Sequence, residues 1–329
     1  MALRLPRLDK DVFTIQDLKE RADKLLPVAV REFFNEGSMD LLTVRDNEQA
    51  YDRYKLRPRV MRDVGEVDTS TTIFNTKVRF PFGFSPAGMH QLAHPDGEIA
   101  TSRAAAGNNI AMALSSYSTK PLEDVVAQGK GNPYGMHVCF FEDRRITLQI
   151  IRRAEAAGFK ALFVSVDTQV LGLRLSEYRN ALALPLGMTT PMLVDDEAGM
   201  GVDDEKSTAA QSDRLSFDPT LTWNETIPWL RKHTKLEIWL KGITCPEDVA
   251  LAIDCGVDGV LISNHGGRQL DGVPASLDAL RECAPVAKGR IRLAVDGGIR
   301  RGSDIFKALA LGADFCMGGR IPLWGLAVS

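Results

Sequence analysis

Short runs of apolar and β-branched residues recur along most of the chain, with helix-like stretches between them. Each run is four to seven residues long and lacks the alternation of a half-exposed strand, which is typical of strands buried on both faces. We therefore predict eight strands, at Phe80–Phe84, Ile110–Leu114, Tyr134–Phe140, Ala161–Val166, Leu236–Lys241, Gly259–Ser263, Arg292–Val295 and Phe315–Gly318.

The segments between these strands have the apolar spacing and the start signals of helices. Clear examples are Arg144–Ala157, Pro246–Cys255 and Gly302–Leu311, and the second of them begins with a proline followed by an acidic residue. Strands that alternate with helices indicate right-handed βαβ units and a parallel sheet. Eight such units favour a closed (β/α)₈ TIM barrel in one α/β domain over residues 1–329, although the pattern alone also fits an open doubly wound sheet.

Three regions depart from the repeat. Residues 1–75 hold helical segments that we expect to precede the barrel (76–329) and close its base: Ile15–Leu25, Pro27–Phe34 and Val44–Tyr54. An insertion at 167–221 carries two acidic clusters and follows the fourth strand, so it leaves from the C-terminal face of the barrel. Long insertions there are commonly lids, and we predict a mobile lid. The eighth helix, which begins near Ile321, is expected to be incomplete.

Charge and composition exclude several classes of protein. A formal net charge of −3 leaves no basic footprint for nucleic acid or an anionic membrane. No window approaches the roughly 18 uninterrupted apolar residues of a membrane span. The five cysteines are dispersed without metal-like spacing, and Met1–Lys10 lacks the apolar centre of a signal peptide. We expect an intracellular protein, cytoplasmic or peroxisomal, with no metal site and no disulfide framework.

The sequence SNHGGRQLD, from Ser263 to Asp271, stands where the sixth strand ends. A histidine there, His265, has an ordinary pKa near neutral and can act as a general base. Arg268 can hold a carboxylate through two hydrogen bonds. A loop histidine with a solvated arginine explains this motif equally well if it is taken alone.

Other charged residues follow neighbouring strands. Lys241 ends the fifth strand, Asp167 ends the fourth, and Arg174 lies in the loop beyond Asp167. A lysine that reaches solvent from a barrel mouth and an aspartate that caps a helix are the simpler explanations. However, all these strand ends open on one face of a barrel, which favours a shared active site. There Asp167 could orient His265, as carboxylates do for catalytic histidines.

Glycine-rich turns follow the last two strands. The first reads DGGIRRG from Asp296, and the second is Gly318-Gly319-Arg320. Backbone N–H groups at such turns and an adjacent arginine bind anions, and barrels commonly place phosphate groups there. We predict a phosphate-bearing cofactor.

These motifs together, with AHPDGE from Ala93 to Glu98, resemble the FMN-dependent 2-hydroxy-acid oxidase/dehydrogenase family, which includes glycolate oxidase, lactate oxidase and the flavin domain of flavocytochrome b2. The resemblance extends from the N-terminal helices to Arg320. It implies FMN as cofactor and oxidation of an (S)-2-hydroxy acid to a 2-oxo acid. Because no haem domain is attached, O₂ is favoured over another acceptor, with H₂O₂ as product. It also implies a homo-oligomer, commonly a tetramer.

The resemblance assigns roles by position. His265 would take a proton from the substrate as the flavin is reduced, and Asp167 would hydrogen-bond His265. Lys241 would lie beside flavin N1 and O2, and Arg174 and Arg268 would hold the substrate carboxylate. The matching phosphate and ribityl contacts are Asp296, Gly298, Arg300, Gly319 and Arg320, and other flavin-lining matches are Ala87, Ser115, Ser165 and Ser263.

Several positions depart from the family pattern. On the substrate side, Phe33 and Cys139 stand where tyrosines are usual, and Tyr117 replaces a tryptophan. On the flavin side, His137 replaces a glutamine, and Gly88 follows Ala87 where the family has Pro-Thr-Ala, which would leave more room near flavin N5. A lost tyrosine hydrogen bond to a carboxylate weakens binding by about 1.5–3 kcal/mol.

Two interpretations of these departures are open. In the first, the enzyme oxidises a 2-hydroxy acid that is larger or more apolar than glycolate. In the second, the chain is a divergent member of a specialised pathway with another FMN-dependent reaction or little of the usual activity. A protein that binds flavin without turnover is a third hypothesis, which the complete acid–base set disfavours.

Overall fold

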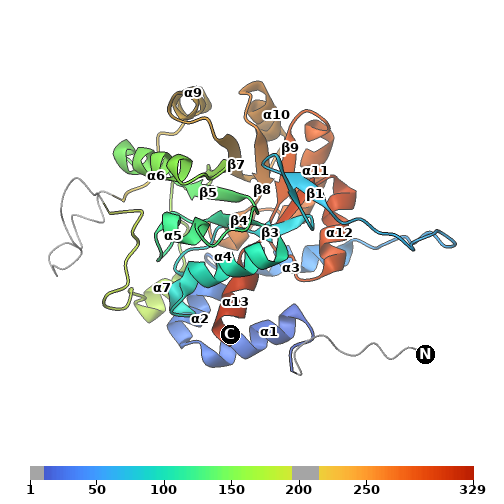
Figure 1. Ribbon diagram of the computed structural model, residues 1–329, viewed down its shortest axis with the longest axis horizontal. Helices are drawn as coiled ribbons and strands as arrows, with labels where there is room; N and C mark the ends of the chain where they lie inside the picture. The colour runs from blue at the N-terminus through green and yellow to red at the C-terminus, as the bar shows by residue number, and fades with distance from the viewer. Residues whose placement is uncertain (1–10, 195–214) are drawn as a thin grey trace.

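The computed structural model describes residues 11–194 and 215–329, and its centre is a closed barrel of eight parallel strands. The strands pair in chain order, and the last pairs with the first (Figure 1). This confirms the predicted barrel and rules out the open sheet. The barrel strands are β3 (Phe82–Phe84), β4 (Ala111–Leu114), β5 (Tyr134–Val138), β6 (Ala161–Ser165), β7 (Glu237–Ile243), β8 (Gly259–Ile262), β9 (Arg292–Val295) and β10 (Phe315–Gly318).

Helices surround the barrel, and their apolar faces form the core between the two layers. In α6, for example, the Asp143 side chain caps the helix by accepting from the Arg145 backbone N–H, and Ile146, Ile150 and Ile151 are buried. The helices around and beside the barrel are α4 (Gly97–Asn108), α5 (Leu122–Val126), α6 (Arg144–Ala156), α9 (Trp223–His233), α10 (Pro246–Asp254), α11 (Ser276–Ala287) and α12 (Gly302–Leu311), with short 3₁₀ turns η1 (His90–Leu92) and η2 (His265–Gly267).

A β-hairpin that the sequence analysis did not predict closes the base of the barrel. Its strands are β1 (Thr71–Ile73) and β2 (Thr76–Val78), which pair antiparallel. Phe74 at its tip packs edge-on against Phe163 and Trp239 inside the barrel, with ring centroids 5.6 and 5.5 Å away. The hairpin therefore fills the end of the barrel that we had assigned to the N-terminal helices.

The N-terminal helices α2 (Val28–Asn35) and α3 (Leu42–Arg53) instead lie against the catalytic face. Asp271, from the HGGRQLD motif, accepts hydrogen bonds from the backbone N–H groups of Asp40, Leu42 and Thr43 at 3.1, 3.2 and 2.8 Å. A carboxylate at this position caps α3 and interacts favourably with the positive end of its dipole. The expectation that these helices close the base was wrong, because the polar groups that they satisfy belong to the loop after β8.

The last helix, α13 (Arg320–Val328), is nine residues long and packs against α1 (Ile15–Leu25). Their contact is apolar and includes Ala22, Leu323 and Trp324. The N-terminal helix α1 thus covers the apolar face of α13. Figure 1 shows α1, α2 and α13 together on one side of the barrel.

The predicted lid stays a prediction. The acidic clusters at 195–205 lie outside the described residues. The described part of the insertion contains α7 (Leu175–Asn180), which packs against α2. Among the described helices, none combines the length and apolarity needed to cross a bilayer.

Candidate active site

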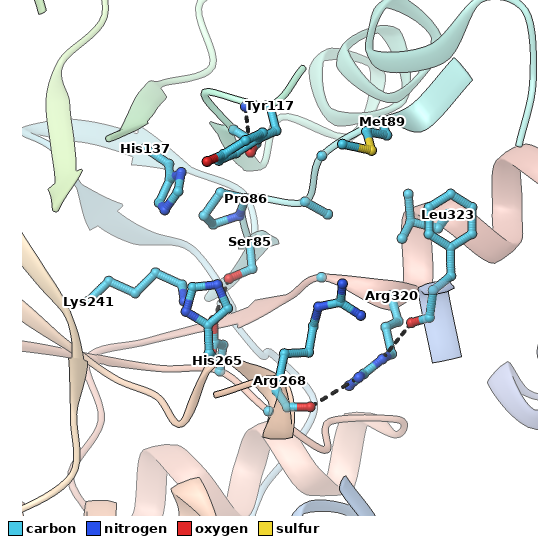
Figure 2. Close-up of a pocket in the computed structure, with 18 of the residues that line it drawn as sticks. Ser85, Pro86, Met89, Tyr117, His137, Lys241, His265, Arg268, Arg320 and Leu323 are labelled. Carbon is cyan, nitrogen blue, oxygen red and sulfur yellow. Dashed lines mark hydrogen bonds between the residues drawn. The ribbon is translucent and has the colours of Figure 1, made fainter. Parts of the chain in front are cut away.

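A cavity of about 380 Å³ opens at the C-terminal ends of the barrel strands, and most of the predicted site residues line it (Figure 2). They come from α2, from the ends of the barrel strands and from the loops that follow them. The predicted residues that line the cavity are Phe33, Ala87, Gly88, Ser115, Tyr117, His137, Cys139, Arg174, Lys241, His265, Arg268, Asp296, Gly298, Arg300, Gly319 and Arg320.

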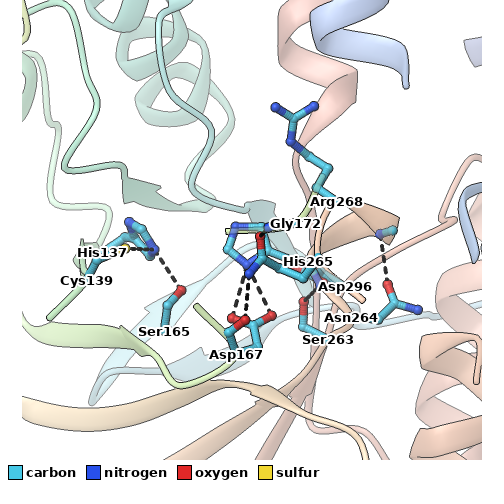
Figure 3. A network of polar contacts seen from close by, with 12 residues as sticks. His137, Cys139, Ser165, Asp167, Gly172, Ser263, Asn264, His265, Arg268 and Asp296 are labelled. Atoms are coloured by element: carbon cyan, nitrogen blue, oxygen red, sulfur yellow. Dashed lines mark hydrogen bonds and ion pairs between the residues drawn. The ribbon is translucent and has the colours of Figure 1, made fainter. Parts of the chain in front are cut away.

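His265 and Asp167 form a hydrogen-bonded pair at the ends of β8 and β6. Nδ1 of His265 lies 3.1 Å from each carboxylate oxygen of Asp167 (Figure 3). The backbone N–H of His265 donates to the Ser263 hydroxyl at 3.1 Å, and the backbone has a left-handed φ of 58°. Such a φ is strained for a residue other than glycine and is found at functional sites. The arrangement fixes the ring and leaves Nε2 free to serve as a base.

Burial and charge both tune this pair. Burial lowers the pKa of His265 and the nearby Lys241 cation lowers it further, while Asp167 opposes them. Burial would raise the pKa of Asp167, but the contact with His265 and the charge of Lys241 outweigh it and hold that pKa below its usual value. At neutral pH the histidine is therefore neutral and the aspartate ionised.

Asp167, Ser165 and Ser263 do not line the cavity but stand behind residues that do. The Ser165 hydroxyl lies 2.9 Å from Nε2 of His137, and Ser263 holds the backbone of His265. The resemblance had placed both serines against the flavin. In the structure they are buried supports, because their side chains are directed toward the neighbouring strand or loop.

Arg174 and Arg268 lie together, and the carboxylate of Glu177 connects them. Glu177 Oε1 is 3.2 Å from Nη1 of Arg174 and 3.5 Å from Nη2 of Arg268. Arg174 also donates through Nε to the Arg268 carbonyl at 3.2 Å. Burial and the neighbouring Arg174 hold the pKa of Arg268 well below its usual value. Paired cations of this kind favour an anion beside them.

The guanidinium of Arg268 also contacts the end of α2. Its Nη1 donates to the carbonyls of Phe33 and Glu36, and its carbon lies 4.8 Å from the centre of the Phe33 ring. Arg320 donates to the Glu36 carbonyl as well, at 3.0 Å. These interactions satisfy carbonyls at the negative end of the helix dipole. Phe33 thus contributes a ring face and a carbonyl where the family tyrosine would contribute a hydroxyl.

The loops after β9 and β10 contain buried polar atoms without a protein partner. Asp296 accepts from the Ser85 hydroxyl at 2.5 Å through Oδ2, whereas its Oδ1 and the Nε of Arg300 have no hydrogen-bond partner among the described residues. Gly298 has a φ of 78°, and a Cβ there would lie 1.9 Å from the Asn47 carbonyl, so α3 and this loop approach as closely as only glycine permits. Buried polar groups are normally paired, so this end of the cavity is suited to a polar ligand.

Comparison with known proteins agrees with this geometry. The family model described as FMN-dependent dehydrogenase matches residues 22–329. The chain belongs to this family of FMN-dependent 2-hydroxy-acid oxidases and dehydrogenases.

Similar proteins of the family cover nearly the whole chain. "Oxidase FUB9" of Fusarium oxysporum f. sp. lycopersici is 49% identical over 319 residues, which cover 96% of this chain and 81% of that protein. "Peroxisomal (S)-2-hydroxy-acid oxidase GLO4" of Oryza sativa subsp. japonica is 42% identical over 318 residues, 95% of this chain and 84% of that protein. A crystal structure of mandelate oxidase superposes with a TM-score of 0.87 at 34% identity, covering 97% of this chain and 88% of that one.

Membership of the family makes FMN the cofactor, and the cavity fits it. The unpaired Asp296 Oδ1 can accept from a ribityl hydroxyl, and the unpaired Arg300 Nε can donate to a phosphate oxygen. Burial, followed by the charge of Arg300, lowers the pKa of Arg320 to about 10, so a nearby phosphate would stabilise its charged form. Among the described residues, no cluster of three metal-binding side chains occurs.

The positions that depart from the family pattern form an uncharged wall of the cavity. Burial raises the pKa of the Cys139 thiol to about 12 and, with the charge of Lys241, lowers that of His137 well below its usual value. We had expected Gly88 to leave open space near the flavin, and the structure shows that it does not. A Cβ at this position would lie 2.8 Å from Cβ of Tyr117, which occupies the room.

Several cavity residues were missed from sequence, notably Glu177, Leu171, Leu215 and Phe217. Glu177 follows Arg174 by three residues, a spacing that pairs side chains on a helix and could have indicated it. The apolar residues belong to the insertion and carry no comparable signal.

Proposed function

We propose that this family member oxidises an (S)-2-hydroxy acid, larger or more apolar than glycolate, to its 2-oxo acid, with O₂ as final acceptor and H₂O₂ as product. The observation that carries the proposal is His265, which Asp167 holds from behind and which lines the same cavity as Arg174, Arg268, Asp296 and Arg300. FMN, when bound, supplies the two-electron acceptor for the carbon that is oxidised.

His265 takes the proton that the substrate loses. Its lowered pKa keeps it neutral near pH 7, and Asp167 stabilises the imidazolium that forms after proton transfer. General bases held in this way contribute about 10²–10⁴ in rate. Oxidation of the alcohol to a carbonyl removes two protons and two electrons. His265 accepts one proton, and the second proton and the electron pair would go to the bound FMN.

Arg174 and Arg268 bind the carboxylate of the substrate and orient its carbon toward the flavin. Lys241, buried at the end of β7, provides a fixed positive charge on the flavin side of the cavity. A cation at that place stabilises the negative charge that reduction adds to the ring. The phosphate and ribityl chain are held by Asp296, Gly298, Arg300, Gly319 and Arg320, and the ring is lined by Ala87, Gly88, Ser115 and His137.

The apolar part of the cavity wall supports the choice of a larger acid. Phe33, Tyr117, Leu171, Leu215 and Phe217 line the cavity with aromatic and aliphatic surface. Phe33 and the protonated Cys139 bring little or no polarity where tyrosine hydroxyls would bind a small polar acid. Burial of an apolar substituent against such a wall favours binding by about 25 cal/mol per Å² of apolar surface buried.

The same substitutions favour a second candidate, an FMN-dependent oxidation of another substrate class. O₂ as acceptor is supported by the names of similar proteins, which call them oxidases. By the same resemblance we propose a homo-oligomer, a tetramer, located in the cytoplasm or in peroxisomes.

Anaerobic titration of the purified holoenzyme tests the proposal. We would add glycolate, lactate, mandelate and long-chain 2-hydroxy acids and follow the visible absorption band of the oxidised flavin. Loss of this band with one class of acid names the substrate class, and H₂O₂ formed on admitting air identifies O₂ as the acceptor. If no acid bleaches the flavin, the second candidate replaces the first.

A further inference from the structure

Glu177 is a carboxylate inside the cavity to which the reaction assigns no role. It lies on α7 and lines the cavity with a side chain that is 29% exposed. Its Oε1 contacts both Arg174 and Arg268, the two cations assigned to the substrate carboxylate. A negative charge at the substrate-binding end of an anion site needs an explanation, because it opposes binding of the substrate anion.

The charges around this end of the cavity nearly balance. Arg174 and Arg268 are positive and Glu177 is negative, so these groups offer one net positive charge. Arg320 lies beyond the Glu36 carbonyl and is assigned to the cofactor phosphate. Lys241 and Asp167, next to His265, carry opposite charges, and His265 is neutral, so these three residues add no net charge. One carboxylate on the substrate is therefore enough to neutralise the two arginines and Glu177.

Among the residues that the structure describes, a second carboxylate would find no further cation in this part of the wall. The described residues that complete this part of the wall are uncharged: Phe33, Tyr117, Cys139, Thr168, Leu171, Leu215 and Phe217. A carboxylate placed among them would lose hydration without a partner and would be repelled by Glu177. Binding sites commonly use such repulsion to reject the wrong ligand.

We propose that Glu177 is a specificity-determining residue that restricts this enzyme to monocarboxylic 2-hydroxy acids and rejects dicarboxylic ones. The inference rests on the proposed function because it takes Arg174 and Arg268 as the site of the substrate carboxylate. Glu177 shares both guanidinium groups with that carboxylate and so sets how much negative charge the site accepts.

The test uses two unreactive probes of equal chain length, 2-oxopentanoate and 2-oxoglutarate, which differ in the terminal carboxylate. Their dissociation constants are measured with the oxidised holoenzyme from the change that they cause in flavin absorption. We expect the wild type to prefer 2-oxopentanoate by about tenfold or more. In Glu177→Gln the preference should fall by about tenfold, mainly through tighter binding of 2-oxoglutarate, and Glu177→Asp should retain it.

Glu32→Gln is the matched control. Glu32 is on α2 and accepts from Asn180 Nδ2 of α7 at 2.7 Å, so it joins the same helices but does not line the cavity. This variant should keep the wild-type preference. The proposal is overturned if wild-type enzyme binds both probes equally, or if Glu177→Gln weakens both probes alike with an unchanged preference, which a purely structural role would produce. Failure of the proposed function would appear separately, as a flavin that no 2-hydroxy acid bleaches.

Discussion

Tyr117 approaches Gly88 so closely that no side chain fits at position 88: a Cβ on Gly88 would lie 2.8 Å from the Tyr117 Cβ and 3.1 Å from its carbonyl oxygen. The backbone N–H of Met89 also donates to the Tyr117 carbonyl at 3.0 Å, so the two loops are held together. Two departures from the family pattern, distant in sequence, are thus one structural feature. The smaller residue beside the flavin accommodates a close approach of the loop after β4.

We predict that Gly88→Ala destabilises the holoenzyme by about 1–3 kcal/mol, because the loop or the Tyr117 backbone must move. Thermal unfolding of the purified proteins measures the effect. Gly107→Ala is the control, since Gly107 lies in α4 with no atom within 4 Å of the added Cβ. It should be neutral or more stable by about 0.5–1 kcal/mol. Equal midpoints for wild type and Gly88→Ala would contradict the contact.

We predict that His265→Ala retains FMN but slows reduction of the flavin by substrate about 10²–10⁴-fold, because the proton loses its acceptor. Stopped-flow absorbance under anaerobic conditions measures the rate, and the ratio of flavin to protein checks the cofactor. Asp167→Asn should also slow reduction, since it removes the carboxylate that orients and stabilises the imidazole. An unchanged reduction rate in His265→Ala would rule out the histidine as the base.

We predict that kcat/KM falls on the acid side only below about pH 6.5, the usual pKa of histidine. The base must be neutral, and burial and Lys241 lower the pKa of His265, so protonation and loss of activity need a lower pH. Lys241→Met removes one cause of this lowering and should move the acid limb to higher pH. Steady-state rates between about pH 4.5 and 8 measure the acid limb of the wild type and of Lys241→Met. If the acid limb of Lys241→Met lies at the same pH as that of the wild type, or at a lower pH, this assignment is refuted.

We predict that Arg268→Lys raises the dissociation constant of substrate or 2-oxo acid product about 10–100-fold. Lysine cannot replace the planar fork or the hydrogen bonds to the Phe33 and Glu36 carbonyls. The affinity for FMN should change much less, because Arg268 contacts Phe33 and Glu177 rather than the loops after β9 and β10. Titrations followed by flavin absorption and by flavin fluorescence separate the two ligands, and equal losses would argue against a carboxylate site.

We predict that Cys139 has no role as a thiolate. Burial raises its pKa to about 12, so the thiol stays protonated at pH 8 and should react slowly with iodoacetamide. Cys139→Ala should reduce the flavin within about threefold of the wild-type rate, because it removes only a small apolar group from the wall. Rapid inactivation by iodoacetamide in the wild type, but not in Cys139→Ala, would show a reactive thiolate instead.

The sequence by itself determined the alternation of buried strands with helices, the strand ends that carry the chemistry and the family, whereas closure of the barrel was decided by the structure. Each strand is an apolar run that must be buried on both faces, and the charged residues follow strand ends, so parallel alternation with helices brings Asp167, Lys241 and His265 to one rim. These are consequences of local pattern and of strand direction.

Only the tertiary structure decided how distant segments meet. The hairpin at Thr71–Val78, not the N-terminal helices, fills the barrel base, because Phe74 fits between Phe163 and Trp239. The contact of Gly88 with Tyr117 and the bridge from Glu177 to Arg268 are likewise invisible in a linear pattern. Such contacts depend on packing at the ångström scale between residues far apart in the chain, and propensity and periodicity describe only neighbours along it.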